Sequence, residues 1–150
     1  MKDFLENFSA DKKIIIYTDG GSRGNPGPSA LGVYFKDFEK KYSFYLGEGT
    51  NNQAEYKAII FALKKAKQLI GKEKARRVSL EIRADSQLVV NQLNGVFKLK
   101  ERDLWPLFIE IWNLKQDFKS VNFRFVLREE NKVADSLVNK ELNLASQRLF

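Results

Sequence analysis

Ile14-Ile15-Ile16-Tyr17-Thr18-Asp19-Gly20-Gly21 is the stretch of this sequence that decides the fold. Its first part, residues 14–17, is a short apolar run, with Lys12 and Lys13 before it and two glycines shortly after it. Such a run is typical of a strand that is buried on both faces. We therefore predict a buried strand that ends at Asp19.

The segments that follow complete three strands before the first helix. Residues 31–38 and 42–46 are rich in aromatic side chains and are separated by the charged stretch 37–41, which is typical of a β-hairpin. Over residues 52–70 apolar side chains recur at helical spacing, and Gly71 ends that helix.

Strands and helices alternate in the second half of the chain. The predicted elements are a strand at 78–84, helices at 86–93 and 104–118, a strand at 122–127 and a helix from Asn131 onward. The order βββαβααβα predicts an α/β domain with a five-stranded mixed sheet flanked by helices. We expect a short N-terminal extension at residues 1–11 and a single domain over residues 12–150.

The composition excludes several kinds of catalytic site. The 150 residues include 26 Lys and Arg against 19 Asp and Glu, a formal net charge of +7, and contain neither His nor Cys. Disulfides, thiolate zinc sites, cysteine nucleophiles and histidine-based triads are therefore excluded. Any metal ion must be held by oxygen, and a pI near 9.5 favours an anionic partner, either nucleic acid or a membrane surface.

The distribution of apolar residues gives no sign of export or membrane insertion. The first residues mix acids with bases and lack the continuous apolar core of a signal peptide. The longest apolar run, residues 58–63, is too short to cross a membrane. We therefore expect a soluble, cytoplasmic protein without a membrane partner. We also expect a monomer.

Acidic residues occupy comparable positions along the predicted elements. Two end strands and two lie in the first turns of helices that follow strands; they are Asp19, Glu55, Asp85 and Asp135. If the first strand runs up, the hairpin makes the third strand run up, and the later strands rise as well. All the acids then lie at one edge of the sheet, which is where open α/β sheets place ligands.

Crowded carboxylates repel one another and raise their pKa values unless cations lie between them. Because the sequence offers neither His nor Cys, the ions that fit are Mg²⁺ or Mn²⁺. Two such ions about 3.5–4 Å apart form the arrangement used in phosphoryl transfer.

Each acid also has a local explanation. Asp19 before the glycines suits a turn, while Asp85 and Glu55 suit helix starts. Asp135, four residues beyond a predicted Asn131 cap, suits the helix dipole. These explanations account for each acid singly but not for their common edge.

Segments that carry these acids resemble type 1 ribonuclease H in order and spacing. They are Thr18-Asp19-Gly20-Gly21-Ser22-Arg23-Gly24-Asn25-Pro26-Gly27-Pro28, Thr50-Asn51-Asn52-Gln53-Ala54-Glu55, Ala84-Asp85-Ser86-Gln87 and Arg128-Glu129-Glu130-Asn131-Lys132-Val133-Ala134-Asp135. The resemblance extends from about Lys12 to Leu142 and implies a ribonuclease H-like fold. It also implies an enzyme that hydrolyses the RNA strand of RNA–DNA hybrids and leaves 3′-hydroxyl and 5′-phosphate ends.

The resemblance assigns the acids to a two-metal-ion mechanism. Asp19 would bridge both ions, and Asp135 would complete the site of the ion that activates water. Glu55 and Asp85 would hold the second ion.

The same motifs imply contacts to both strands of the hybrid. Contacts to RNA are implied for Gly20, Gly21, Ser22, Asn52 and Gln87, and contacts nearer the DNA for Asn25, Thr50 and Asn51. Local alternatives stay open, because the glycines and prolines of residues 20–28 suit a turn, and Thr50 with Gln53 suits a capping box.

The chain departs from many bacterial members of this family in two segments. The loop at residues 127–131 contains no His and resembles the archaeal-type branch. Arg128 in that loop is a candidate phosphate contact, and a solvated arginine is the alternative. The segment at 95–103 is short where many members have a basic protrusion, although Lys98, Lys100 and Arg102 remain candidates for DNA phosphate contacts.

Further alternatives concern specificity, the catalytic state and the surface. Double-stranded RNA is a possible additional substrate, as in some archaeal-type relatives, and a catalytically silent nucleic-acid-binding module of this fold is the alternative to an enzyme. We expect Trp105 and Trp112 to lie in the core. We also expect the densest positive cluster to be solvated surface far from the acids; it comprises Lys64, Lys65, Lys67, Lys72, Lys74, Arg76 and Arg77.

Overall fold

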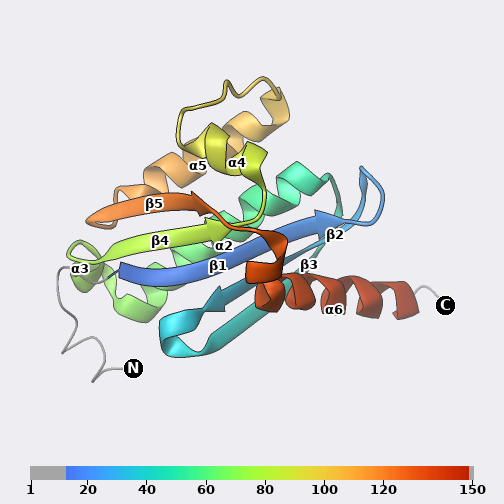
Figure 1. Ribbon diagram of the computed structural model, residues 1–150, viewed down its shortest axis with the longest axis horizontal. Helices are drawn as coiled ribbons and strands as arrows, with labels where there is room; N and C mark the ends of the chain where they lie inside the picture. The colour runs from blue at the N-terminus through green and yellow to red at the C-terminus, as the bar shows by residue number, and fades with distance from the viewer. Residues whose placement is uncertain (1–12, 149–150) are drawn as a thin grey trace.

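A computed structural model describes residues 13–148 of the chain (Figure 1). The predicted extension at residues 1–11 lies outside the described residues. The elements are β1 (Lys13–Ser22), β2 (Gly27–Phe35), η1 (Lys36–Phe38), β3 (Lys40–Gly49), α2 (Asn51–Ile70), α3 (Lys72–Ala75), β4 (Ser79–Ala84), α4 (Gln87–Leu93), η2 (Arg102–Leu104), α5 (Trp105–Lys115), β5 (Ser120–Phe125), η3 (Arg128–Glu130) and α6 (Lys132–Arg148).

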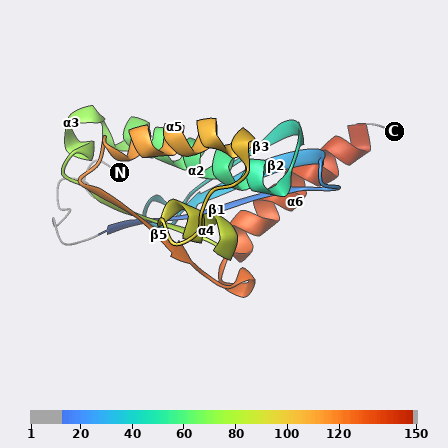
Figure 2. The same ribbon diagram turned by 90° about the horizontal axis from the view of Figure 1, so that it is seen from above.

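The strands form one mixed sheet in the order β3-β2-β1-β4-β5. β2 pairs antiparallel with β1 and β3, whereas β1, β4 and β5 run parallel. This confirms the predicted five-stranded mixed sheet and the predicted strand directions. Figure 2 shows α2 and α5 on one side of the sheet and α6 on the other.

The core follows from the periodicity of the sequence. Ile14 and Ile16 point to the same side of β1 and are both fully buried. α2 covers them with a stripe that includes Ile59 and Leu63, which are also fully buried. β1 is therefore fixed in the middle of the sheet by packing as well as by pairing.

Element boundaries differ from the predicted ones where pairing outweighs hydrophobicity. β2 begins at Gly27, before the apolar residues, because Gly27 pairs with Gly49 of β3. The short helix α3 was not predicted, since four residues give too little periodicity to detect.

The expectation that Trp105 and Trp112 lie in the core is wrong. They are 44% and 56% exposed, whereas Leu104 and Ile111 are buried. α5 is apolar around most of its circumference, so the sequence pattern did not distinguish the face that packs on α2. Among residues 13–148, no helix combines the length and apolar character that crossing a membrane requires.

Candidate active site

Asp19 lies near the carboxyl end of the central strand. Its position in β1 pairs with Gly32 of β2, and the residue is only 6% exposed. The neighbouring pair Thr18 and Ala84 joins β1 to β4 in parallel register. Asp85, directly after β4, is therefore brought beside Asp19.

Glu55 reaches the same place from the first turns of α2. A capping box fixes where this helix begins, because Thr50 accepts from the Gln53 backbone while the Gln53 side chain accepts from the Thr50 backbone. With that start, Glu55 falls on the buried face and is 6% exposed. This capping role of Thr50 and Gln53 was one of the alternatives left open by the sequence.

Close backbone approach brings the strand and the helix together. A Cβ atom at Gly20 would lie 2.2 Å from the carbonyl carbon of Ala54, a distance that no side chain tolerates. Glycine at this position therefore allows the end of β1 to contact the first turn of α2. Asp19 and Glu55 are the chain neighbours of these two residues.

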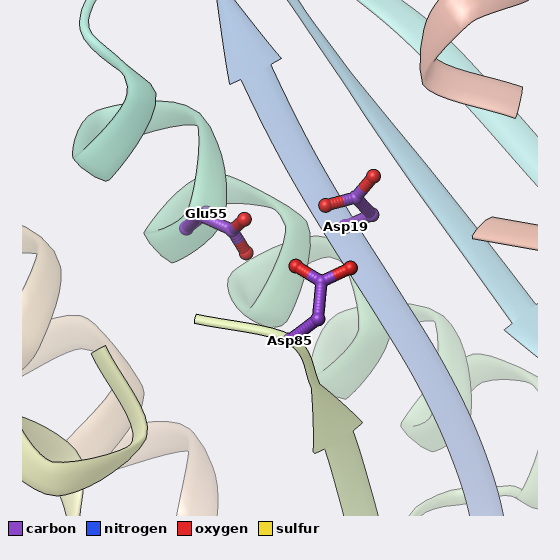
Figure 3. Close-up of side chains that lie close together, drawn as sticks. All are labelled: Asp19, Glu55 and Asp85. Carbon is purple, nitrogen blue, oxygen red and sulfur yellow. The ribbon is translucent and has the colours of Figure 1, made fainter. Parts of the chain in front are cut away.

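Oxygen atoms from Asp19, Glu55 and Asp85 lie within 4.8 Å of one another (Figure 3). Figure 3 shows the side chains converging from β1, α2 and the end of β4. The common edge expected from strand direction thus exists for these acids.

Asp135 lies beside this cluster and not within it. It lines the same cleft, and its charge raises the pKa of both Asp19 and Asp85. Its Oδ2 accepts a hydrogen bond from Asn139 Nδ2 at 3.3 Å. Gly32 sets its helix close to the sheet, because a Cβ there would lie 2.4 Å from the Ala134 carbonyl oxygen.

The clustered carboxyl groups bind protons unusually tightly. Burial, together with the charge of Asp85, raises the pKa of Asp19 to about 8. Burial and the charge of Asp19 also raise the pKa of Glu55. Burial raises the pKa of Asp85, although a hydrogen bond from Asn131 and the charge of Arg128 oppose this shift.

A divalent cation suits this donor set. The Oε2 atom of Glu55 is buried without a hydrogen-bond partner among the described residues. The three converging side chains offer only carboxylate oxygens, which are the hard ligands that Mg²⁺ and Mn²⁺ prefer. A cation would satisfy the unpaired oxygen and would offset both the burial of the charges and the mutual repulsion that raise the pKa values.

The acids lie in an open cleft of about 420 Å³. Of the residues predicted to contact substrate, those that line it are Gly20, Gly21, Ser22, Asn51, Asn52 and Arg128. Asn51 also connects the two sides of the cleft, since its Oδ1 accepts from the Ser22 backbone at 2.9 Å.

The other predicted substrate contacts lie outside the cleft lining. Thr50 caps α2, and Asn25 Oδ1 accepts from the Asn51 backbone at 3.0 Å. Gln87 is exposed at the first position of α4. Thr50 and Asn25 thus support the cleft wall, and contact of all three with substrate stays a prediction.

Asn131 was missed as a residue of the site. Residue 131 immediately precedes α6, as expected of a cap, but its side-chain nitrogen donates to the Thr18 carbonyl at 2.9 Å and to Asp85 Oδ2 at 3.2 Å. An asparagine before a helix is an ordinary cap signal, so the local sequence gives no indication of these contacts.

The fold and this cleft define an α/β protein with a candidate site for phosphoryl-transfer chemistry. The family model described as "Reverse transcriptase-like" matches residues 18–141. A bifunctional protein of Mycobacterium tuberculosis is 38% identical over 142 residues, which cover 90% of this chain and 37% of that protein.

The matches to solved structures of related proteins cover nearly the whole of those chains. The RNase H1 of the halophilic archaeon Halobacterium salinarum is 35% identical, with a TM-score of 0.78, and the match covers 88% of this chain and 98% of that chain. LC11-RNase H1 in complex with an RNA/DNA hybrid is 42% identical, with a TM-score of 0.83, covering 89% and 99%.

The chain belongs to the ribonuclease H family. It spans 37% of the length of the first curated relatives that it matches. The predicted ribonuclease H-like fold and the resemblance to ribonuclease HI, including an archaeal member, are confirmed.

Proposed function

We propose that this chain is a metal-dependent endoribonuclease that hydrolyses the RNA strand of RNA–DNA hybrids and leaves 3′-hydroxyl and 5′-phosphate ends. The observation that carries this proposal is the cluster of carboxylate oxygens from Asp19, Glu55 and Asp85, all within 4.8 Å of one another. The similarity to LC11-RNase H1, whose structure contains an RNA/DNA hybrid, supports this choice of substrate.

The proposed cofactor is Mg²⁺ or Mn²⁺, with two ions in each site. Asp19 would contact both ions, Glu55 and Asp85 would hold one, and Asp135 would complete the other. When bound, the ions would lower the pKa of the attacking water and offset the charge on the leaving 3′ oxygen. The chain contributes by holding its carboxylates in place before the substrate binds.

Recognition of a hybrid requires groups that reach both strands. In the proposed complex the backbone of residues 20–22, the Asn52 side chain and Gln87 contact the RNA, whose 2′-hydroxyls line a wide minor groove. Asn25, Thr50 and Asn51 lie nearer the DNA strand. The hydrogen bond between Asn51 and the Ser22 backbone supports this arrangement, because it fixes the end of β1 against the start of α2.

A second hollow next to α4 offers contacts for the DNA backbone. It measures about 440 Å³, and its lining includes Phe97, Lys98 and Lys100. Both lysines are exposed, so their ammonium groups are free to approach phosphate oxygens. If both lysines contact phosphates, together they contribute about 2 to the slope of log affinity against log salt, so salt weakens the binding measurably.

A cleavage assay with matched duplexes tests the proposal. The same RNA sequence, labelled at one end, is offered as a hybrid with DNA, as double-stranded RNA and as a single strand, with Mg²⁺, with Mn²⁺ or with excess chelator. We expect the hybrid to be cut within the RNA strand only when a divalent cation is present. Cleavage of the double-stranded RNA in the same series would establish the broader specificity.

Other outcomes of this assay separate the alternatives. Tight binding of the hybrid without cleavage under any metal condition would favour a catalytically silent binding module. Cleavage that persists in excess chelator would contradict the role assigned to the acids.

A further inference from the structure

Asn131 joins three elements that carry acids of the site. Its side-chain nitrogen donates to the Thr18 carbonyl at 2.9 Å and to Asp85 Oδ2 at 3.2 Å. Its backbone carbonyl accepts from the Asp135 backbone at 3.0 Å. The end of β1, the carboxylate after β4 and the first turn of α6 are thus tied to one residue.

The orientation of the Asn131 amide is set by its partners. A backbone carbonyl only accepts hydrogen bonds, so the amide nitrogen and not its oxygen must face Thr18. The same nitrogen has a second hydrogen, and this one faces Asp85. The residue is 1% exposed, which leaves its side chain little freedom to turn away.

A structural cap alone does not explain this side chain. An asparagine that caps a helix uses its oxygen to accept from the first turn, but Asn131 Oδ1 is buried with no hydrogen-bond partner among residues 13–148. An unpaired buried acceptor destabilises the fold. The Asn131 oxygen therefore lacks a hydrogen bond, while the Asn131 nitrogen donates one to the Asp85 carboxylate.

We propose that Asn131 is a positioning residue that holds the Asp85 carboxylate toward Asp19 and Glu55 and thereby sets the affinity of the site for divalent cations. The proposal rests on the proposed function, because it concerns the same acids. Hydrogen-bond partners of metal-binding carboxylates act in this way by fixing the direction of the ligand oxygens.

The test uses variants that separate positioning from stability. Asn131→Ala removes the amide, and Asn131→Ser removes it while keeping a residue that favours a helix start. Asn94→Ala is the matched control, because Asn94 Nδ2 donates to the Phe123 carbonyl of β5 at 3.0 Å without a carboxylate partner. The free energy of unfolding is measured for each variant in chelator.

The decisive measurement is the affinity for Mn²⁺, by calorimetry on the substrate-free protein. We expect Asn131→Ala and Asn131→Ser to bind Mn²⁺ about 10–100-fold more weakly than the unaltered chain. We also expect the Mg²⁺ concentration for half-maximal cleavage to rise by a similar factor. Asn94→Ala should lose stability without changing the Mn²⁺ affinity by more than about twofold.

Mn²⁺ affinity within twofold of the unaltered chain in either folded Asn131 variant would overturn this inference. The proposed function would survive that result, since the unaltered chain would still bind metal and cleave the hybrid. If the unaltered chain neither bound Mn²⁺ nor cleaved the hybrid, the proposed function itself would fail. The two failures are therefore distinguishable in one experiment.

Discussion

Gly20 lies against the backbone of Ala54 so closely that a Cβ atom at Gly20 would come within 2.2 Å of the Ala54 carbonyl carbon. This contact joins the end of β1 to the first turn of α2. Because Asp19 precedes Gly20 and Glu55 follows Ala54, the contact also brings two acids of the site together. Gly20, near the end of β1, therefore allows close packing next to the acids.

Gly20→Ala is predicted to destabilise the protein and to weaken cation binding. The added methyl group must push α2 away from β1, and overpacking of this kind costs about 1–3 kcal/mol. Gly21→Ala is the control, since its Cβ would lie 3.7 Å from Val138 Cγ1, an ordinary contact. Urea unfolding of both variants checks the difference; equal stability would show that β1 and α2 do not depend on this approach.

Stability without metal is predicted to fall as pH rises. The pKa of Asp19 is about 8 in the folded protein, whereas the ordinary pKa of an aspartate is 3.8, so between these values the folded state holds a proton that the unfolded chain releases. The stabilisation that the Asp19 proton gives to the folded state is complete below about pH 4 and is lost as pH rises through about 8. Thermal unfolding in chelator across this range measures the slope.

Asp19→Asn should make the stability of the metal-free protein fall less with rising pH. It should also stabilise the metal-free protein at pH 8. A gain of about 1 kcal/mol corresponds to a rise in Tm of about 2–4 °C for a chain of this size. Mg²⁺ should stabilise the unaltered chain at pH 8, because it binds the folded state. A metal-free Tm of the unaltered chain that does not fall between pH 5 and 9 would contradict the crowding of these acids.

Asp135→Asn is predicted to lower activity with little effect on stability. Asp135 lies outside the cluster of mutually close carboxylates and is only half-buried, so its charge costs less in the folded state. We expect cleavage to slow by about 100-fold, which corresponds to ~2.7 kcal/mol of transition-state stabilisation. Single-turnover rates and Tm values are compared with those of Ser136→Ala, an exposed neighbour on the same helix.

Arg128→Ala is predicted to raise KM for the hybrid by up to about fivefold, since an ion contact of this exposed side chain is worth up to about 1 kcal/mol. Arg128 lines the cleft, and its charge opposes the rise that burial causes in the pKa of Asp85, which places the guanidinium near the acids. Arg124→Ala is the control, because the Arg124 side chain on β5 is 62% exposed and does not line the cleft. Unchanged rate and affinity in Arg128→Ala would end the phosphate-binding idea.

The basic cluster around α3 is predicted to play no part in hybrid binding. Lys64 and Lys67 pair with Glu110 and Asp117. Four other bases of the cluster are exposed and form no ion pair within residues 13–148: Lys72, Lys74, Arg76 and Arg77. α2 alone separates them from the acids by about 20 Å or more.

A variant in which the four exposed bases of this cluster are all replaced by glutamine should have an unchanged KM and an unchanged salt dependence of binding. Its substitutions are Lys72→Gln, Lys74→Gln, Arg76→Gln and Arg77→Gln. The double variant Lys98→Gln, Lys100→Gln should reduce the slope of log affinity against log salt by about 2, because each phosphate contact contributes roughly 0.9. Binding titrations at several salt concentrations measure both slopes. The reverse pattern would place the nucleic acid on the opposite side of the molecule.

The sequence allowed the fold and the convergence of the acids to be predicted because both depend on periodicity and strand direction. Ile14 and Ile16 define β1, and the parallel pairing of β1 with β4 then brings Asp85 to Asp19. These features are local or follow from chain order. The capping box of α2 could also be predicted, because it depends only on the local sequence from Thr50 to Gln53.

Tertiary contacts accounted for what could not be predicted. Asn131 resembles a helix cap in sequence, and only the packing of α6 beside β1 shows that its amide faces Asp85. Trp112 lies on a helix that is apolar on most sides, so periodicity did not reveal that it is exposed. Asp135 lines the same cleft as the other acids, as expected, but strand direction does not reveal that it lies outside the group of mutually close carboxylates.

The most direct test of the central claim compares the unaltered chain with Asp85→Asn on one RNA–DNA hybrid, in single-turnover cleavage at saturating Mg²⁺. The Asn side chain keeps the shape of the carboxylate but removes its charge. We predict that the RNA strand is cut by the unaltered chain only when Mg²⁺ is present, and about 100-fold or more slowly by the variant. Cleavage by Asp85→Asn at a rate close to that of the unaltered chain, or cleavage by either protein in excess chelator, would contradict a metal-dependent mechanism at these carboxylates.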